Sequence, residues 1–121
     1  MTKIDENSGK NEVLAIVSKL GWNLKFASKK LQDDAEVVSV AVKNYGWALQ
    51  YASSRLQSDR TIVLASVIQD HQAFQYCHPK FYDDKEIVIL VVKKYGYYLK
   101  LASPRLKADP EIVIAALIQN S

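Results

Sequence analysis

Hydrophobic and polar residues recur along this chain with a period of 25 residues. A large apolar residue, a small residue, a second large apolar residue and an aspartate return in every period. These four columns are Leu24, Leu49, Phe74 and Leu99; Ala27, Ala52, Cys77 and Ala102; Leu31, Leu56, Phe81 and Leu106; and Asp34, Asp59, Asp84 and Asp109. Residues 35–59 and 85–109 are identical at 12 of 25 positions, which indicates internal repetition of one structural unit. The units cover residues 10–34, 35–59, 60–84, 85–109 and 110–121.

Each unit carries the signals of a long helix, a short helix and a one-turn helix. The long helix begins after an aspartate, as in Asp109-Pro110-Glu111, where Asp109 suits the N-cap and Pro110 the first helical position. A glycine such as Gly46 follows this helix, where a left-handed C′ residue is expected. Ser53 is placed to cap the one-turn helix.

These signals predict an all-α fold, a right-handed α-solenoid of about four and a half 25-residue units. It would form a single helical-repeat domain over residues 11–121, after a polar N-terminal tail at residues 1–10. The apolar residues 87–92 also suit a β-strand, and strands would give an α/β horseshoe instead. The Asp-Pro-Glu start and the alanines within residues 112–118 favour helices.

Residues 36–59 read E-V-V-x-x-A-V-x-x-x-G-x-x-L-x-x-A-S-x-x-L-x-x-D, and residues 86–109 are a near copy. This phrase resembles the repeat of unknown function catalogued under the number 4116, and the resemblance covers residues 11–120. It implies a helical repeat of the kind found in effector-like proteins of intracellular bacteria and in protist proteins. It implies no activity, because the family has no defined catalytic residues. The unit at residues 60–84 departs most from the phrase.

Composition and charge narrow the classes of protein that the chain can represent. The net charge is +3, and 49% hydrophobic with 24% charged residues are ordinary globular values. A single cysteine, Cys77, excludes an intrachain disulfide and a zinc site with several thiolates. The longest apolar run has seven residues, whereas a membrane span needs about 20, and no secretory signal opens the chain. We expect a cytoplasmic protein without a membrane partner, located in a host cytosol if it is a bacterial effector.

The third unit contains the residues that could serve a chemical reaction. His71, Cys77 and His78 replace the glycine, alanine and serine of the other units, which suggests a metal site or a thiol enzyme. Each also fits a structural role. Cys77 suits a small buried position, His78 a cap before Pro79, and His71 a positive-φ position after a helix. Because a zinc site needs three or four converging ligands, we expect no enzyme, no cofactor and no bound metal, and keep an enzyme using these residues as the less favoured alternative.

A basic column runs through the units as Lys30, Arg55, Lys80 and Arg105. Such a column can meet the acidic surface of another protein, and Tyr82 and His78 lie beside it in the third unit. Alternatively, each basic residue pairs with an aspartate four residues later, as Arg55 would with Asp59, or with an acid of the next unit. Duplex nucleic acid is not an expected partner, because the aspartate column runs parallel to the basic one.

Three aromatic residues, Trp22, Trp47 and Tyr97, each follow a glycine of the repeat. Such positions pack between successive units more often than they face solvent, so we expect them to belong to the core. The alternative is a ladder of rings that stacks bases or a peptide.

The two ends of the array differ in polarity. Glu12 stands in the column that holds Val37 and other aliphatic residues, as expected of an end without a neighbour. The last helix keeps Ile112, Ile114, Leu117 and Ile118, with no following unit to cover them. We therefore expect a homodimer through this helix or a downstream continuation of the array. The favoured function is a non-catalytic protein–protein interaction module of unknown specific function; the alternative is a structural fragment or end of a larger repeat array.

Overall fold

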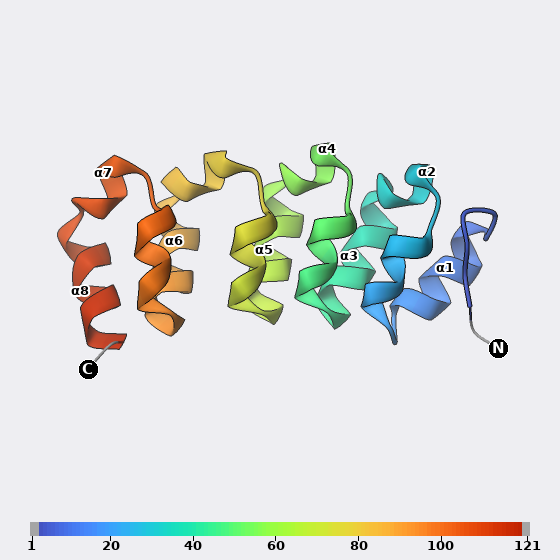
Figure 1. Ribbon diagram of the computed structural model, residues 1–121, viewed down its shortest axis with the longest axis horizontal. Helices are drawn as coiled ribbons and strands as arrows, with labels where there is room; N and C mark the ends of the chain where they lie inside the picture. Colours follow the sequence, from blue (N-terminus) through green and yellow to red (C-terminus); the bar gives the residue numbers. More distant parts are fainter. Residues whose placement is uncertain (1–2, 120–121) are drawn as a thin grey trace. The chain divides into compact units, whose positions relative to one another are not determined.

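The computed structural model describes residues 3–119, and all regular structure in this range is helical (Figure 1). The predicted all-α fold class is confirmed, and the alternative horseshoe is wrong because no strand occurs among these residues. With η denoting a 3₁₀ helix, the elements are α1 (Lys10–Val17), η1 (Gly21–Phe26), α2 (Lys29–Gln32), α3 (Ala35–Asn44), η2 (Gly46–Tyr51), α4 (Ser54–Gln57), α5 (Arg60–Gln69), η3 (His71–Tyr76), η4 (Pro79–Asp83), α6 (Lys85–Lys94), η5 (Gly96–Leu101), α7 (Pro104–Lys107) and α8 (Pro110–Gln119).

One succession of elements recurs along the chain. A helix of 8 or 10 residues is followed by a 3₁₀ helix of 6 residues and then by a one-turn α-helix of 4 residues. In the third repeat the one-turn α-helix is replaced by the 3₁₀ helix η4. The predicted succession of a long, a short and a one-turn element therefore occurs within residues 10–109, with a 3₁₀ helix as the last element of the third unit. Within residues 3–119 no helix combines the length and the hydropathy that crossing a membrane requires.

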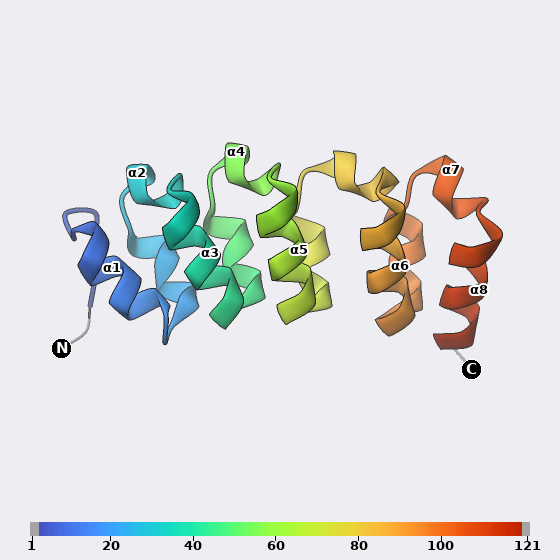
Figure 2. The same ribbon diagram turned by 180° about the vertical axis from the view of Figure 1, so that it is seen from behind.

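Residues Met1–Cys77 form one compact unit of two layers. In the first layer, α1 packs against α3, and α3 packs against α5. The second layer consists of η1, η2 and η3, which contact one another in chain order (Figures 1 and 2). Each of η1 and η2 also contacts α3, so the two layers share one interior.

Residues His78–Ser121 form the second compact unit. Here α6 packs against α8, and η5 contacts both of these helices. The flanking elements η4 and α7 lie against α6 and α8, respectively. The single domain over residues 11–121 and the solenoid arrangement stay predictions.

Side-chain caps determine where the helices begin. The carboxylate of Asp109 accepts a hydrogen bond from the backbone N–H of Glu111 at 2.9 Å, before α8. The Oγ of Ser53 accepts from the N–H of Leu56 at 3.3 Å, at the start of α4. The aspartates that cap the other ten-residue helices are Asp34, Asp59 and Asp84. These bonds satisfy backbone donors that have no partner within the helix, so the predicted N-caps are confirmed.

The long helices are buried on two sides. In α3 the buried residues are Val37, Val38, Ala41 and Val42; in α6 they are Ile87, Val88, Val91 and Val92. In each helix the buried residues form two adjacent pairs on consecutive turns. The buried part of the helix surface is therefore wide, and other elements must cover it. Helices of this kind are stable only when other elements pack against both sides.

Glycine follows the long helices for a reason that differs from our prediction. No described residue has a positive φ, so the left-handed conformation expected at Gly46 and at His71 is wrong. Gly46 begins η2, and its N–H donates a hydrogen bond to Oε1 of Gln69. A Cβ at Gly46 would lie 2.5 Å from the carbonyl oxygen of Ser66 in α5. Glycine is required because η2 lies directly against the backbone of the next long helix.

Among residues 3–9, which precede α1, one side chain is buried. Ile4 is 4% exposed. Asp5 accepts a hydrogen bond from the N–H of Asn7 at 2.8 Å, which fixes a turn. Lys10 is the first residue of α1, and its Nζ lies 3.0 Å from carboxylate oxygens of Asp34 and Glu36.

Candidate protein-binding surface

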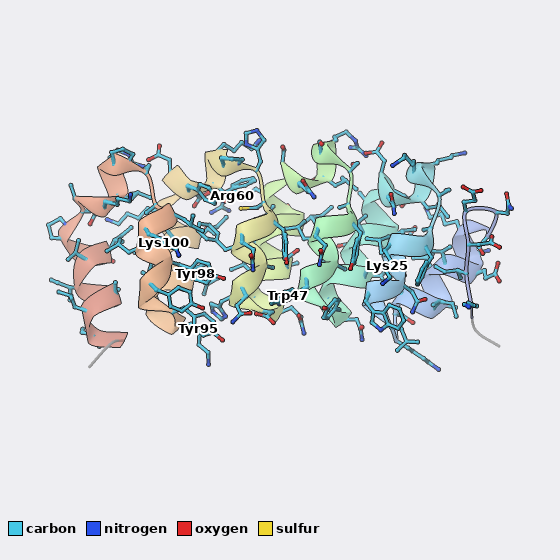
Figure 3. All side chains as sticks on the ribbon, in the orientation of Figure 1. Lys25, Trp47, Arg60, Tyr95, Tyr98 and Lys100 are labelled. Carbon is cyan, nitrogen blue, oxygen red and sulfur yellow. The ribbon has the colours of Figure 1, made fainter. Side chains whose placement is uncertain are left out.

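An exposed pair of aromatic rings lies on η1. Trp22 and Phe26 are 42% and 39% exposed, and their ring centroids are 6.1 Å apart with an interplanar angle of 72°. The Nζ of Lys25 lies 5.4 Å from the centroid of Trp22 and 5.0 Å from that of Phe26 (Figure 3). The cation therefore lies within attractive range of both rings. We call Trp22, Lys25 and Phe26 the aromatic patch.

The local fold explains why two of these side chains, Trp22 and Lys25, face solvent. Asn23 and Leu24 are buried in the same 3₁₀ helix. Because a 3₁₀ helix has three residues per turn, Trp22 and Lys25 share its outer side, whereas Phe26 follows Asn23 by one turn and is the last residue of the helix. Leu20, immediately before the helix, is also 41% exposed and extends the apolar surface.

The aromatic residue after the glycine has a different environment in different repeats. Trp47 is half-buried, and its Nε1–H donates to a carboxylate oxygen of Asp70 at 2.8 Å (Figure 3). Tyr45, which has no carboxylate, occupies the same position relative to Trp22 as Asp70 does relative to Trp47. The prediction that the aromatic residues pack as core is wrong for Trp22 and for Tyr97, which is 53% exposed.

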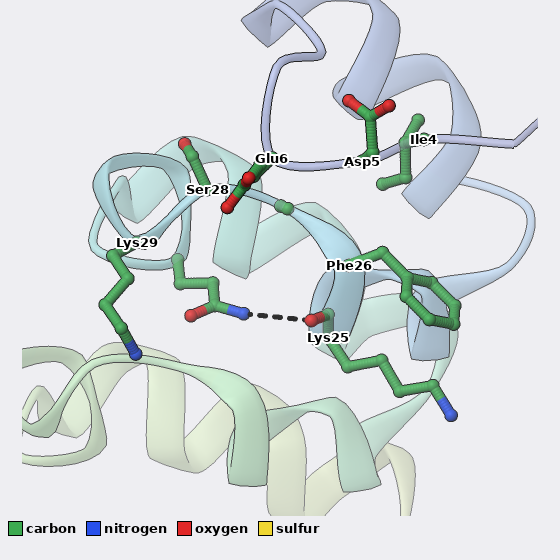
Figure 4. Close-up of a pocket in the computed structure, with 9 residues that line it drawn as sticks. Ile4, Asp5, Glu6, Lys25, Phe26, Ser28 and Lys29 are labelled. Atoms are coloured by element: carbon green, nitrogen blue, oxygen red, sulfur yellow. Dashed lines mark hydrogen bonds between the residues drawn. The ribbon is translucent and has the colours of Figure 1, made fainter.

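A pocket of about 460 Å³ borders the aromatic patch (Figure 4). It is lined by Ile4, Asp5, Glu6, Lys25, Phe26, Ala27, Ser28, Lys29 and Gln32. The Nε2 of Gln32 donates to the carbonyl oxygen of Leu24 at 3.0 Å, which ties α2 to η1. Within the described part of the chain no buried side-chain nitrogen or oxygen lacks a hydrogen-bond partner. The pocket thus combines one aromatic ring with charged side chains of both signs.

The two arginines of the basic column are held by the preceding repeat. The Nε of Arg55 donates to Oδ1 of Asp33 at 2.9 Å, and its Nη2 donates to the carbonyl oxygen of Asp33 at 2.6 Å. Arg105 makes the same two bonds to Asp83, at 3.0 and 2.9 Å. The predicted pairing of Arg55 with Asp59 is wrong, because Asp59 caps α5 instead. Because both pairs are exposed, solvent screening leaves them only a small effect on stability.

The two lysines of the column have different surroundings. Each arginine binds an aspartate 22 residues earlier, and Ser8 and Ser58 occupy that position relative to Lys30 and Lys80. Among residues 3–119 neither lysine forms an ion pair. The Nζ of Lys80 lies 5.2 Å from the ring centroid of Phe81. The charges of the column that remain available to a partner are therefore mainly those of the lysines.

The aspartates that bind the arginines have lowered pKa values. The hydroxyl of Ser53 donates to Asp33 at 2.5 Å, and this bond, followed by the ion pair with Arg55, lowers the pKa of Asp33 below 3.8. Ser103 and Arg105 act in the same way on Asp83. Because the folded carboxyl is more acidic than the unfolded one, the stabilisation is present above the unfolded pKa. It is lost as the pH falls through the folded pKa.

Replacing Ser53 with alanine is expected to raise the pKa of Asp33 toward 3.8, because the largest cause of its lowering is removed. Asp83 serves as an internal control, since its own serine is unchanged and its pKa should stay low. Carboxyl ¹³C chemical shifts followed from about pH 6 to about pH 2 report both groups. An unchanged pKa of Asp33 in the variant would contradict the role assigned to Ser53.

The candidate chemical residues of the third unit have local structural roles. Cys77 is buried, its Sγ–H donates to the carbonyl oxygen of Phe74 at 3.2 Å, and burial raises the pKa of its thiol to about 12. His78 is exposed, and its Nδ1 accepts a hydrogen bond from the N–H of Lys80 at 3.0 Å. Tyr82 is half-buried, and its carbonyl oxygen accepts from the N–H of Ser103 at 2.8 Å. In residues 3–119 no three His, Cys, Asp or Glu side chains are arranged to hold a metal ion.

The Cys77 thiol should resist alkylation in the folded protein. A pKa of about 12, against 9.0 for an ordinary thiol, leaves roughly 1,000-fold less thiolate at pH 8, and burial slows access further. Iodoacetamide labelling followed by mass spectrometry, with and without denaturant, measures the ratio of rates. An exposed thiol introduced as Ser54→Cys in a Cys77→Ala chain provides the reactive control. Equal labelling of Cys77 in native and denatured protein would show that it is accessible.

The apolar residues of α8 have two different environments. Ile112 is fully buried, so the prediction that it remains uncovered is wrong; it is buried because α8 packs against α6. Ile114, Leu117 and Ile118 are 55%, 63% and 68% exposed.

Three segments of the chain, residues 10–53, 36–82 and 84–121, match the family model described as Domain of unknown function (DUF4116). The chain belongs to the DUF4116 family. Each DUF4116 match spans more than one and fewer than two of the 25-residue repeats, and the matches confirm the family resemblance drawn from residues 36–59 and 86–109. No curated protein and no solved structure matches the chain. The function of this DUF4116 protein must therefore be inferred from its own surface.

Proposed function

We propose that this chain is a non-catalytic protein-binding module built as a right-handed α-solenoid of 25-residue units. The aromatic patch is the observation that carries the proposal. Trp22 and Phe26 expose about two fifths of their surface, lie edge to face and are spanned by Lys25. Aromatic side chains are enriched where proteins bind one another and supply much of the binding energy. An exposed aromatic pair beside a pocket fits a partner with an apolar side chain and nearby acidic groups.

Packing within each compact unit supports the solenoid part of the proposal. Successive long helices contact each other in chain order, as α1, α3 and α5 do, and the 3₁₀ helices form the second layer. Most buried positions keep their apolar character from repeat to repeat, with Asn23 and Ser66 as polar exceptions, while exposed positions vary. Such a design lets each repeat present a different surface on a constant core. The buried, weakly acidic thiol of Cys77 supports a function without thiol catalysis.

The basic column supplies positive charge in each compact unit, from Lys30 and Arg55 in the first and from Lys80 and Arg105 in the second. Lys30, Arg55, Lys80 and Arg105 are all exposed. Tyr82 and His78 lie beside the column in sequence and would add aromatic contacts in the third repeat. A protein with an acidic surface matches these charges.

A peptide library displayed on phage, selected against immobilised protein, tests this proposal. Peptides enriched on the wild-type chain should bind a Trp22→Ala/Phe26→Ala variant at least about 30-fold more weakly, because losing an aromatic hot spot removes about 2 kcal/mol or more. Tyr97→Ala is the matched control, since Tyr97 is another exposed aromatic residue following a repeat glycine. Enriched peptides that bind the double variant and the wild type equally would contradict the assignment of the patch. Failure to enrich any peptide would contradict the binding function.

A further inference from the structure

Two pockets occupy equivalent places in the first two repeats. The pocket beside the aromatic patch is lined by residues 25–29 and others, and a second pocket of about 460 Å³ is lined by residues 50–54 and others. These two segments are 25 residues apart, so the second pocket repeats the first one unit later. Lys29 and Gln32 line both pockets, which therefore lie side by side in the compact unit Met1–Cys77. We call them the first pocket and the second pocket.

An aromatic ring lines each pocket at the same position of the repeat. Phe26 and Tyr51 are the last residues of η1 and η2. Phe26 is 39% exposed beside the first pocket (Figure 4), and Tyr51 is half-buried beside the second. Among residues 3–119 the hydroxyl of Tyr51 has no hydrogen-bond partner. Grooves lined by aromatic rings bind extended, proline-rich chains, and a free phenol can donate to the backbone of such a chain.

The second pocket has one uncompensated charge, which is positive. Of the described residues that line it, only Lys29 is charged. Lys29 is exposed and forms no ion pair in the described part of the chain. Ser53, also in the lining, donates to Asp33, whose carboxylate binds Arg55 as well. The charge of the second pocket therefore complements an acidic side chain.

The separation of the pockets determines which peptide conformation can enter both. Packed helices lie about 8–10 Å apart, and pockets one repeat apart are separated by roughly this distance. In a polyproline II helix, residues three positions apart lie on one side and about 9 Å from each other. A β-strand directs residues three positions apart to opposite faces. An α-helix bonds its own backbone groups, whereas a polyproline II helix leaves its carbonyl oxygens free to accept from the protein.

We propose that the two pockets bind an extended peptide in the polyproline II conformation, with an apolar residue on Phe26 and an acidic residue three positions away beside Lys29. This inference rests on the proposed binding function and names the chemistry of its partner. In the first pocket Asp5 and Glu6 offset the charges of the two lysines in its lining, so an uncharged residue fits there. In the second pocket the acidic residue pairs with Lys29, and the Tyr51 hydroxyl donates to a peptide carbonyl oxygen.

Proline octapeptides that carry one leucine and one glutamate test the spacing. In the matched peptides these two residues are three positions apart, in either order along the chain. In the control peptides they are two positions apart, which a polyproline II helix directs to different sides. Fluorescence anisotropy of labelled peptides should show that a matched peptide binds at least about threefold more tightly than its control. Equal affinities, or no binding of either matched peptide at about 1 mM protein, would overturn the proposal.

Charge reversal tests the contact between the acidic residue and Lys29. Lys29→Glu should weaken binding of the matched peptide at least about tenfold, because repulsion replaces attraction, and should strengthen binding of a peptide with lysine in place of glutamate. Lys43→Glu is the matched control, since Lys43 is exposed on α3 and lines neither pocket. Tyr51→Phe should weaken binding about threefold through loss of one hydrogen bond. Equal effects of Lys29→Glu and Lys43→Glu would overturn the assigned contact.

Failure of this inference can be distinguished from failure of the proposed function. Library peptides that bind through Trp22 and Phe26, found while the matched octapeptides do not bind, would leave the binding function standing and remove the two-pocket inference alone. A library that yields no binding peptide, together with octapeptides that do not bind, would remove both.

Discussion

Replacing Phe74 with alanine is expected to lower the free energy of unfolding by about 3–5 kcal/mol. Phe74 is fully buried in η3 and ranks among the largest fully buried side chains. The substitution removes most of the ring's contacts and leaves a cavity that the surrounding helices can fill only in part. Chemical denaturation followed by circular dichroism and by tryptophan fluorescence gives the value, provided that the two transitions coincide.

Two further variants distinguish the effect of burial from that of residue type. Phe26→Ala, at a site that is 39% exposed on η1, should cost about 1 kcal/mol or less. Phe74→Leu introduces the residue found at the equivalent positions Leu24 and Leu49, and should cost less than Phe74→Ala because more of the volume is kept. Equal losses for Phe74→Ala and Phe26→Ala would show that Phe74 is not part of a close-packed core.

Replacing Gly46 with alanine is expected to destabilise the protein by about 1–3 kcal/mol through overpacking. The new Cβ would lie 2.5 Å from the carbonyl oxygen of Ser66 and 2.9 Å from Oε1 of Gln69. The Gln69 side chain can rotate, but the Ser66 carbonyl is fixed by its hydrogen bond from the N–H of Asp70 at 2.9 Å. Relieving the contact therefore requires η2 to move away from α5. Thermal and chemical denaturation measure the loss.

Gly9→Ala is the control for this effect, because no atom lies within 4 Å of a Cβ built at Gly9. Gly9 is the N-cap of α1, where glycine is preferred over alanine, so this variant should lose about 0.5–1 kcal/mol, without the added cost of overpacking. Adding Gln69→Ala to the Gly46→Ala chain should not restore stability, since the closer obstacle is backbone. Full recovery in that double variant would show that Gln69, rather than Ser66, excludes the Cβ.

Helix positions and the buried columns could be predicted from the sequence because they depend on neighbouring residues. Asp109 and Pro110 mark the start of α8, and Ser53 marks the start of α4, through hydrogen bonds within three residues. The repetition then transfers each such assignment to the equivalent positions of the other units. By propensity alone the apolar run at residues 87–92 suits a strand as well as a helix. The capping residues correctly indicated a helix.

The candidate surface could not be predicted in the same way because it depends on contacts between repeats. Trp47 is partly covered because Asp70, in the following repeat, accepts its indole N–H, and Trp22 has no such acceptor. Arg55 binds an aspartate of the preceding repeat rather than the one four residues later. Both pairs join residues 22 or 23 positions apart in the chain. A search for complementary polar residues at this separation would have indicated both contacts. The exposure of Leu117 depends instead on how α8 packs in the folded chain.

The bonded set of Asp33, Ser53 and Arg55 recurs two repeats later as Asp83, Ser103 and Arg105. Each set joins two successive repeats, so a duplicated gene segment that encodes two repeats carries both the donors and their acceptor. Joining such a segment in register also restores the set at the junction. A segment that encodes a single repeat would bring Ser58 to the place of the acceptor, and the arginine would lose its carboxylate. Recombination can therefore lengthen or shorten this chain by pairs of repeats with its hydrogen bonds complete, whereas odd steps need further mutation.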